Sequence, residues 1–236
     1  MNGNTAAAGI GADEEIATIA GVAIALDPKV MSPKMMEVLR AARYERQEAR
    51  QLVNHLQPGD RVVELGAGVG FLSSLAHLQG KAAHIAAYEA NPHLIPTIRQ
   101  THALNGAAAE VHNAIIVPSP EVTSLPFYIR NDFWASSLLP RPPNFIEEVT
   151  VPAIPFAEML ERHNPTFLIV DIEGGEADLF RTVPLTGVKK VLIELHQRVI
   201  GRVGMKRVFD FFSQRDFHYD QMGSEGSVVL FSHVLR

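Results

Sequence analysis

An acidic residue and three glycines lie close together in the first third of the chain. A short apolar run begins at Arg61 and contains Glu64, and glycines follow at positions 66, 68 and 70. A strand that leads through glycines into a helix brings bare backbone against a ligand near the helix N-terminus. A dinucleotide fingerprint would place its third glycine one position later, and an acid at Glu64 would repel a pyrophosphate. The spacing therefore favours a positively charged ligand, and a turn needed only for strand–helix packing is the alternative.

Polar side chains also end the next two apolar runs. Glu89 follows the run that begins at His84, and a carboxylate at such a position can accept hydrogen bonds from both hydroxyls of a ribose. Its alternative role is to cap a helix beside Asn91-Pro92. Asn113 and Ala114 end the third run, where the asparagine is equally suited to a turn.

Three carboxylates follow the fourth apolar run, at Asp171, Glu173 and Glu176. Asp171 falls at the edge of the predicted sheet where ligands of α/β proteins bind. Glu173 and Glu176 can instead stabilise the start of the next helix through its dipole. Three carboxylates can also hold a divalent metal. Because the sequence supplies no clear additional ligand, we expect no metal.

Glu194 and His196 end the fifth run. Side chains two residues apart on one strand point to the same face, so the pair should lie together. His196 is the first candidate for a catalytic base, with Glu194 orienting its imidazole, and Asp171 is the second candidate. Alternatively, Glu194 and His196 cap the strand end or bond to the neighbouring loop.

Strand-like runs alternate with helical spacing from Arg61 onward. We expect strands at residues 61–65, 84–88, 110–115, 167–170, 190–194 and 228–232. We expect helices from 33 to about 42 and at about 44–56, 70–79, 92–104, 175–183 and 204–214. This alternation predicts an α/β fold with a mostly parallel central sheet and helices on both faces.

The remaining segments predict one domain with two additions. Residues 1–13 are small and polar and predict a flexible tail, whereas residues 14–236 form the single domain. Residues 14–57 are an N-terminal extension of a strand or hairpin and helices. Residues 116–155 are rich in proline, which predicts an insertion before the fourth core strand that lies over the carboxyl edge as a lid. In this segment Trp134, Ser136 and Ser137 have a composition suited to contact with a substrate.

The composition excludes several classes of protein. The 236 residues include no cysteine, so disulfides, thiolate metal clusters and a cysteine nucleophile are excluded. The net charge of −5 argues against a broad basic surface for nucleic acid. The apolar run at 16–26 is shorter than the roughly 20 residues of a membrane span, and acids rather than basic residues precede it. We expect a soluble, cytoplasmic protein.

The segment from Glu64 to Gly70 resembles the first motif of class I S-adenosylmethionine-dependent methyltransferases. The resemblance implies a Rossmann-like methyltransferase fold and S-adenosylmethionine as cofactor. It further implies that the glycine loop passes the amino acid part of the cofactor, that Glu64 contacts its amino group, and that Asn113 and Ala114 border the adenine. The cofactor-binding residues expected on this basis are Glu45, Glu64, Gly66, Ala67, Gly68, Gly70, Glu89, Ala90, Asn113, Ala114 and Asp171.

Three other segments are similar to one family within this class. The run Asp171-Ile-Glu-Gly-Gly-Glu176 looks like the D-x-E-G-x-E signature of the FkbM family of methyltransferases. Tyr44-Glu45 with Glu48 is similar to the Y-E-x-x-E segment that precedes the first strand in this family. Residues 191–196 match its acid-and-histidine fifth strand. The resemblance covers about residues 44–196 and none of residues 1–43.

The family resemblance implies O-methylation of a hydroxyl on a small-molecule, sugar or glycan-like acceptor (EC 2.1.1). Direct transfer requires the acceptor oxygen, the methyl carbon and the sulfur in line, and the hydroxyl must lose a proton to a base. His196, Glu194 and Asp171 are the expected catalytic residues. The alternatives are an RNA or protein methyltransferase and a non-catalytic cofactor-binding scaffold. We expect no nucleic acid partner, and the sequence leaves the oligomeric state open.

Overall fold

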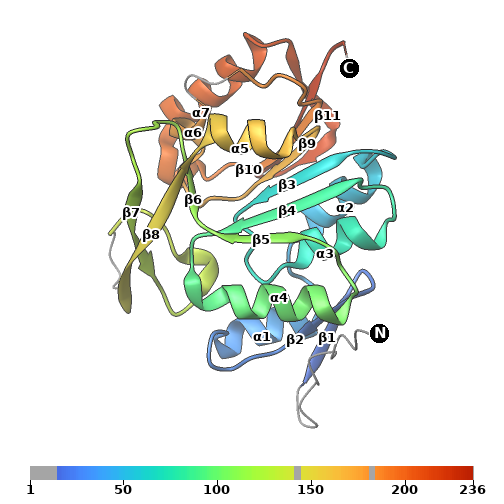
Figure 1. Ribbon diagram of the computed structural model, residues 1–236, viewed down its shortest axis with the longest axis vertical. Helices are drawn as coiled ribbons and strands as arrows, with labels where there is room; N and C mark the ends of the chain where they lie inside the picture. The colour runs from blue at the N-terminus through green and yellow to red at the C-terminus, as the bar shows by residue number, and fades with distance from the viewer. Residues whose placement is uncertain (1–14, 141–144, 181–183, 236) are drawn as a thin grey trace, which may run out of the picture.

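The fold is built around one seven-stranded sheet (Figure 1). The computed structural model describes residues 15–140, 145–180 and 184–235, so the expected tail at 1–13 lies outside the described residues. Five neighbouring strands run parallel, in the order β10 (Lys190–Glu194), β9 (Phe167–Val170), β3 (Arg61–Leu65), β4 (His84–Glu89) and β5 (Glu110–Asn113). Two antiparallel strands, β12 (Val228–His233) and β11 (Phe217–Glu225), extend the sheet beyond β10. The predicted α/β fold with a mostly parallel sheet is confirmed.

Helices cover both faces of this sheet. One core cluster contains residues of α1 (Pro33–Arg40), α2 (Arg46–His55), α3 (Phe71–Leu78) and α4 (Ile95–Leu104). The other contains residues of α5 (Phe156–His163), α6 (Glu176–Leu179) and α7 (Gln197–Ser213). Val62 belongs to the first cluster and its neighbour Val63 to the second, and both are fully buried. Burial on both faces explains why the strands are continuous apolar runs rather than alternating ones.

The N-terminal extension begins with a hairpin of β1 (Ile16–Ile19) and β2 (Val22–Ala25). Its turn residues, Ala20 and Gly21, both have positive φ, at 47° and 86°, as two-residue hairpin turns require. The apolar run at 16–26 is therefore a core hairpin. α1 follows, and the Ser32 hydroxyl accepts a hydrogen bond from Met35 N (3.2 Å) at its start. Among the described helices, none has the length and apolarity to cross a membrane.

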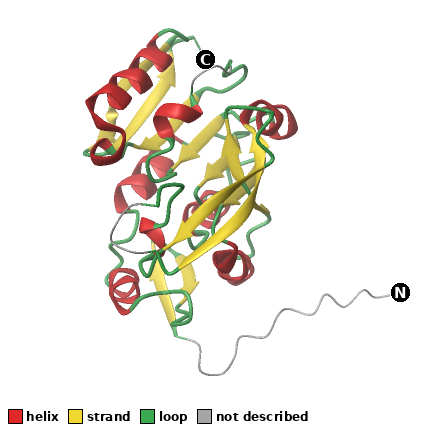
Figure 2. Ribbon diagram, turned by 90° about the vertical axis from the view of Figure 1, so that its left-hand side faces the viewer, coloured by secondary structure: helices red, strands yellow, loops and turns green. Residues whose placement is uncertain are grey.

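The proline-rich segment forms a second, smaller sheet beside the main one. Its strands are β6 (Ile115–Val117), β8 (Glu147–Pro155) and β7 (Ser124–Ile129), in that order, and the short helix η2 (Phe133–Ala135) lies between β7 and β8. Figure 2 views the molecule from the side on which this small sheet lies. Pro126 and Pro152 lie in its strands rather than in the central sheet, where the missing N–H would break a ladder hydrogen bond.

Several elements differ from the sequence-based expectation. α5 and β11 were not expected, and β11 carries exposed polar residues between buried Phe217 and Gly223, so it lacks an apolar run. α7 begins at Gln197 rather than near residue 204 and contains a non-helical residue, Gly201 (φ 66°). The 3₁₀ helix η1 (Pro92–Leu94) precedes α4 within the helix expected at 92–104. The helix expected at 175–183 is short, since α6 spans only Glu176–Leu179, and residues 181–183 lie outside the described residues.

Candidate active site

The carboxyl ends of β3 and β9 meet at the glycine loop. Asp171 N donates a hydrogen bond to Leu65 O (2.8 Å), which continues the pairing of the two strands past their ends. Gly66 has φ of 87°, and a Cβ atom there would lie 1.7 Å from Asp171 O. Only glycine allows this approach, so the loop and Asp171 form one rigid edge.

Two carboxylates at this edge each have one buried oxygen without a hydrogen-bond partner among the described residues. Glu64 is 2% exposed, and its Oε2 atom has no hydrogen-bond partner among the described residues. Burial raises the pKa of Glu64 to about 8. The Oδ1 atom of Asp171 is likewise buried and unpartnered within the described chain, and burial together with Glu194 and Glu173 raises the pKa of Asp171 well above its ordinary value. Because buried anions without partners are costly, this edge suits a ligand that carries positive charge.

Tyr44 and Glu45 enclose the same loop from the N-terminal extension. Tyr44 packs edge-on against Phe133, with ring centroids 6.5 Å apart. Its hydroxyl lies against Gly68, where a Cβ atom would come within 2.5 Å of the Tyr44 oxygen. Burial and the nearby Glu64 carboxylate raise the pKa of Glu45 well above its ordinary value. Glu45 therefore adds a third acidic side chain, beside Glu64 and Asp171, to the edge that suits a positively charged ligand.

Glu89 ends β4 and joins the glycine loop to the segment after β4 through its two carboxylate oxygens. Its Oε2 accepts a hydrogen bond from Gly68 N (2.9 Å), and its Oε1 accepts one from Asn91 N (2.7 Å). Burial raises the pKa of Glu89 to about 7. The helix cap beside it is Asn91 itself, whose side chain accepts from His93 N (3.0 Å). Asn91 therefore caps the helix, and the Glu89 carboxylate remains bonded to Gly68 of the glycine loop.

At the end of the site where the adenine is expected, the side chain of Asn113 bonds to backbone carbonyls after β4. The Asn113 side-chain amide donates to Glu89 O (2.8 Å) and to Ala90 O (3.0 Å), so it joins the ends of β4 and β5. Ala90 and Ala114 line the adjoining cavity, whereas Asn113 does not. Direct contact between Asn113 and a cofactor stays a prediction. The buried Ala67 and Gly70 lie in the turn before α3, where Gly70 N donates to Ala67 O (2.7 Å).

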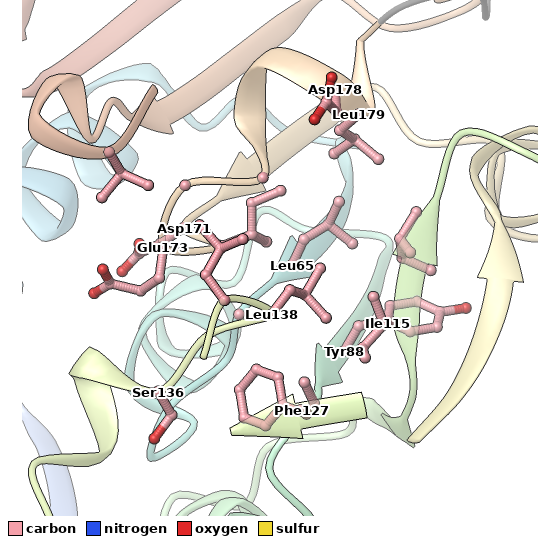
Figure 3. Close-up of a pocket in the computed structure, with 18 of the residues that line it drawn as sticks. Leu65, Tyr88, Ile115, Phe127, Ser136, Leu138, Asp171, Glu173, Asp178 and Leu179 are labelled. Carbon is pink, nitrogen blue, oxygen red and sulfur yellow. The ribbon is translucent and has the colours of Figure 1, made fainter. Parts of the chain in front are cut away.

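A cavity of about 570 Å³ opens at this edge (Figure 3). Asp171 and Glu173 line one part of it, and the opposite wall is apolar. The apolar wall includes residues of the small sheet, of the loop after η2 and of α7, namely Ile115, Leu125, Phe127, Leu138, Val199 and Ile200. The cavity therefore places the carboxylates of Asp171 and Glu173 opposite an apolar wall.

Polar contacts within the loop between β7 and β8 hold its shape, and one further contact ties it to α1. Arg130 Nη1 donates to Ala135 O (2.7 Å) and to Ser137 Oγ (3.1 Å), and Arg130 Nη2 donates to Leu139 O (2.9 Å). The Ser32 hydroxyl at the start of α1 donates to Asp132 Oδ1 (2.6 Å). Trp134 and Ser136 of this loop line the cavity. The loop that lines the cavity is thus braced internally by Arg130 and tied to α1 through Asp132.

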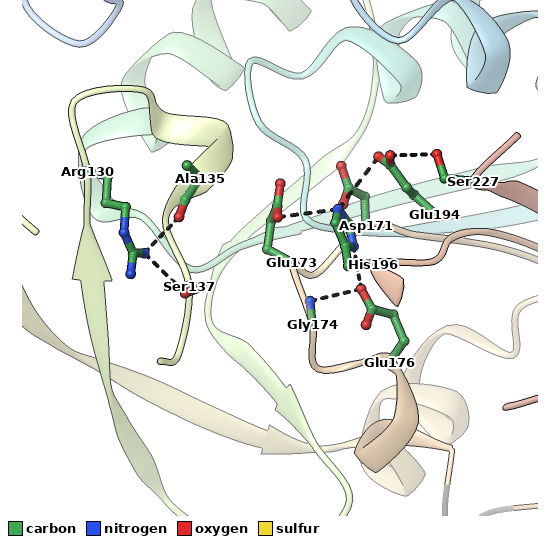
Figure 4. A network of polar contacts seen from close by, with 10 residues as sticks. All are labelled: Arg130, Ala135, Ser137, Asp171, Glu173, Gly174, Glu176, Glu194, His196 and Ser227. Atoms are coloured by element: carbon green, nitrogen blue, oxygen red, sulfur yellow. Dashed lines mark hydrogen bonds and ion pairs between the residues drawn. The ribbon is translucent and has the colours of Figure 1, made fainter. Parts of the chain in front are cut away.

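His196 lies among four carboxylates (Figure 4). Its Nδ1 atom is 2.6 Å from Glu176 Oε1, and its Nε2 atom faces three further acids: Glu173 at 3.3 Å, Asp171 at 3.8 Å and Glu194 at 4.0 Å. Burial lowers the pKa of His196, but the hydrogen bond to Glu176 and the nearby acids outweigh it and raise the pKa to about 9. Without other positive charge in the cluster, these acids therefore favour the protonated form of His196.

The partners of the expected Glu194–His196 pair differ from the prediction. Glu194 Oε1 accepts a hydrogen bond from Ser227 Oγ (3.0 Å), and the imidazole is oriented instead by the fully buried Glu176. The sequence could not reveal this role, because Glu176 and His196 lie on different elements. The sequence showed no clear metal ligand beyond the three carboxylates. In the structure His196 is such a candidate, because its ligand atom and those of Asp171 and Glu173 lie within 4.8 Å of one another.

Sequence comparison decides the family. The profile described as "Methyltransferase FkbM domain" matches residues 64–219. The chain belongs to the FkbM methyltransferase family. The matched region begins at Glu64 and includes Asp171 and His196, so the family resemblance inferred from the motifs is confirmed. Among curated proteins, no sequence matches the chain.

Solved structures are similar to this FkbM-family chain at low sequence identity. A Streptococcus mutans protein assigned as an S-adenosylmethionine-dependent methyltransferase has a TM-score of 0.50 and 9% identity, covering 94% of this chain and 56% of that chain. TYW2 of M. jannaschii in complex with AdoMet has a TM-score of 0.46 and 12% identity, with coverages of 94% and 87%. The tRNA (uracil-54, C5)-methyltransferase of Pyrococcus abyssi has a TM-score of 0.44 and 13% identity, with coverages of 94% and 44%.

The FkbM-family chain thus brings the sequence-predicted acids to one edge of its sheet. Glu64, Glu89 and Asp171 surround the glycine loop, and Glu194 and His196 lie beside Asp171. Two residues of the apolar wall, Phe127 and Leu138, carried no signal in the sequence, because an apolar residue on a cavity wall is indistinguishable by type from a core residue.

Proposed function

We propose that this S-adenosylmethionine-dependent methyltransferase methylates a hydroxyl group of a small-molecule, sugar or glycan-like acceptor by direct in-line transfer. The observation that carries the proposal is the cavity of about 570 Å³, with Asp171 and Glu173 on one side and a mostly apolar wall opposite them. Cavities of roughly 300–1,000 Å³ enclose small ligands. A cavity of this size suits a small acceptor.

The donor side of the site is formed by acids and bare backbone. S-adenosylmethionine supplies a methyl group on a positively charged sulfur, which leaves as a neutral thioether. In this proposal the buried carboxylates of Glu64 and Asp171 offset the positive charge of the donor, and the Glu89 carboxylate accepts from its ribose hydroxyls. Ala90 and Ala114 flank the adenine, and the backbone of Gly66 and Gly68 allows close approach. The unpartnered buried oxygens of Glu64 and Asp171 support this assignment.

The proton acceptor is assigned to the carboxylates that reach the cavity. His196 was the first candidate base, but its pKa of about 9 leaves its nitrogens protonated at neutral pH. Burial raises the pKa of Glu173 to about 7, close to the range in which a general base works best. We place the removal of the hydroxyl proton at Asp171 or Glu173, with Glu194 and His196 holding these acids in position.

The domain assignment is part of the same proposal. Residues 14–236 act as one methyltransferase domain, and residues 14–57 extend it by supplying Tyr44 and Glu45 to the donor side. Residues 116–155 act as the lid over the acceptor. Contact of Leu125, Phe127 and Trp134 with the cavity supports the lid role.

Transfer of a labelled methyl group tests the proposal. The chain is incubated with methyl-labelled S-adenosylmethionine and a cell extract, which is then separated into small-molecule, RNA and protein fractions. We expect label in the small-molecule fraction, in a product that carries the methyl group as a methyl ether. Label in RNA or protein contradicts the proposal in favour of a macromolecular acceptor. Donor binding without label in any fraction identifies a non-catalytic scaffold.

A matched pair of variants shows whether the transfer comes from this protein rather than from a contaminating enzyme in the assay. Asp171→Asn removes the carboxylate shared by the donor and acceptor sides, and we expect at least about a hundredfold loss of transfer. Glu161→Gln changes an exposed acid on α5 and should leave transfer unchanged.

A further inference from the structure

The Nε2 atom of His196 faces more acceptors than one proton can serve. Three carboxylate oxygens, from Glu173, Asp171 and Glu194, lie 3.3, 3.8 and 4.0 Å from it. A single N–H donates a good hydrogen bond to one acceptor only. The Nε2 proton can therefore serve only one of the three acids, whereas a multivalent cation could contact all of them.

Buried oxygens within this cluster lack partners. Asp171 Oδ1, the atom 3.8 Å from His196 Nε2, is buried and has no hydrogen-bond partner in the described part of the chain. Glu176 is 0% exposed and its carboxylate is directed at the imidazole (Figure 4). Its Oε1 meets Gly174 N (2.9 Å) and His196 Nδ1, while Oε2 has no partner among the described residues. The cluster thus holds excess negative charge in a largely buried place.

The spacing of the cluster is close to that of ligands around a metal ion. An octahedral ion with bonds of about 2.1 Å holds neighbouring ligands about 3.0 Å apart and opposite ligands about 4.2 Å apart. Glu173, 3.3 Å from His196 Nε2, lies near the separation of neighbouring ligands, and Glu194, at 4.0 Å, lies near that of opposite ligands. Asp171, at 3.8 Å, would move closer to Nε2 on binding an ion. The acids and the imidazole come from the ends of β9 and β10 and the loop after β9, so neighbouring strand ends fix their separation.

We propose that Asp171, Glu173, Glu194 and His196 Nε2 bind one divalent cation of the Mn²⁺ type at the cavity wall. Carboxylates and one imidazole suit this ion, because Mg²⁺ prefers oxygen ligands and water, and a four-coordinate Zn²⁺ site is smaller. Glu176 is a positioning residue: its bond to Nδ1 directs Nε2 toward the ion, as acids behind metal-bound histidines commonly do.

The cation deepens the proposed function, on which its catalytic role rests. Asp171 and Glu173 line the cavity, so an ion between them lies where the acceptor hydroxyl must sit. A bound cation lowers the pKa of a hydroxyl. With the ion present Asp171 and Glu173 are its ligands, so the hydroxyl proton passes to water in place of these carboxylates, and water reaches their 28% exposed side chains. The oxygen lone pair forms the new O–CH₃ bond as the C–S pair moves to sulfur. Four protein ligands leave two octahedral positions, which favours acceptors with two neighbouring oxygens.

A second histidine cluster provides an internal control. His84, Glu110 and His163 also hold ligand atoms within 4.8 Å of one another, and His84 and Glu110 lie at the amino-terminal ends of β4 and β5. Both nitrogens of His163 already have partners there, namely His84 Nε2 (3.0 Å) and the Tyr88 hydroxyl (2.8 Å). The second cluster therefore has its donors and acceptors matched, unlike the cluster at His196.

Calorimetric titration of Mn²⁺ into the full chain without any donor tests the cation site. We expect one ion per chain, with affinity at least tenfold weaker in Glu173→Gln and in His196→Gln, and about tenfold weaker in Glu176→Gln. His84→Ala should bind Mn²⁺ as the unaltered chain does. Absence of stoichiometric binding, equal affinity in Glu173→Gln and His196→Gln, or loss of binding in His84→Ala overturns the proposal.

The thermal shift produced by S-adenosylmethionine, measured in parallel, separates the cation site from the proposed function. A shift retained in Glu173→Gln and His196→Gln shows that these variants are folded, so their weaker Mn²⁺ binding reports the site itself. A donor-induced shift in a chain that binds no Mn²⁺ overturns the cation site alone. Mn²⁺ binding without any donor-induced shift instead contradicts the proposed function and leaves the cation site supported.

Discussion

At the scale of single residues, the close approach of Gly66 to Asp171 and the acids around the glycine loop determine which ligand this site can bind. Gly66 allows the loop after β3 to touch Asp171 O, and no larger residue fits. Glu64, Glu89 and Asp171 then gather around the loop, with pKa values raised chiefly by burial. A site built in this way favours a cationic ligand, because each buried acid is stabilised when positive charge arrives.

Replacement of Gly66 by alanine tests the close approach. The new Cβ atom would lie 1.7 Å from Asp171 O, at a backbone φ of 87°. We expect Gly66→Ala to lower the free energy of unfolding by about 3 kcal/mol or more, since steric clash adds to backbone strain. Gly80→Ala is the matched control, because its φ is 64° but no atom lies within 4 Å, and it should cost about 1–2 kcal/mol. Urea denaturation measures both, and equal losses would argue against the contact.

The protonation of His196 gives a second prediction at this scale. Removal of the Glu176 charge in Glu176→Gln takes away the principal contact that raises the pKa of His196, which should therefore fall from about 9. Nuclear magnetic resonance of the imidazole as pH is varied reports this pKa directly. A pKa that does not change in Glu176→Gln would show that Glu176 does not control the imidazole.

At the scale of elements, the sequence predicted what depends on apolar runs and missed what depends on packing partners. Strands β3, β9 and β10 were predicted with their observed bounds, because each is buried on both faces. β11 was missed because it is an edge strand with mostly exposed polar residues. Likewise the acids at strand ends were predictable, whereas the pairing of Glu176 with His196 depends on how the loop after β9 folds back.

The loop between β7 and β8 gives a prediction at the element scale. Arg130 donates hydrogen bonds to Ala135, Ser137 and Leu139, and thereby holds the loop that carries Trp134. We expect Arg130→Ala to speed amide hydrogen exchange in residues 133–139 by about tenfold or more, because local opening becomes less costly. Arg99→Ala, which changes an exposed arginine on α4, should leave this exchange unchanged. Mass spectrometry of deuterium uptake makes the comparison, and equal uptake in both variants would contradict the anchoring role.

At the scale of the whole molecule, buried acids link stability to pH. Glu64 has a pKa of about 8 in the folded chain, against an ordinary value of 4.5, so the folded state binds this proton more tightly than the unfolded state. Its contribution to stability is therefore present below about pH 4.5 and is lost as pH rises through about 8. We expect the free energy of unfolding to fall with rising pH across this window, less steeply in Glu64→Gln than in the control Glu161→Gln. Identical slopes in the two variants would contradict this linkage.

The same linkage allows a direct test of the central claim, that buried acids at the glycine loop receive a positively charged methyl donor. At pH 7 Glu64, with a pKa of about 8, is largely protonated in the free chain, and a bound cation should make it release its proton. Calorimetric titration of S-adenosylmethionine in two buffers of different ionisation enthalpy measures the protons released. The account predicts a net release of about one proton that is reduced in Glu64→Gln. Binding without proton release, or with the same release in Glu64→Gln, would contradict it.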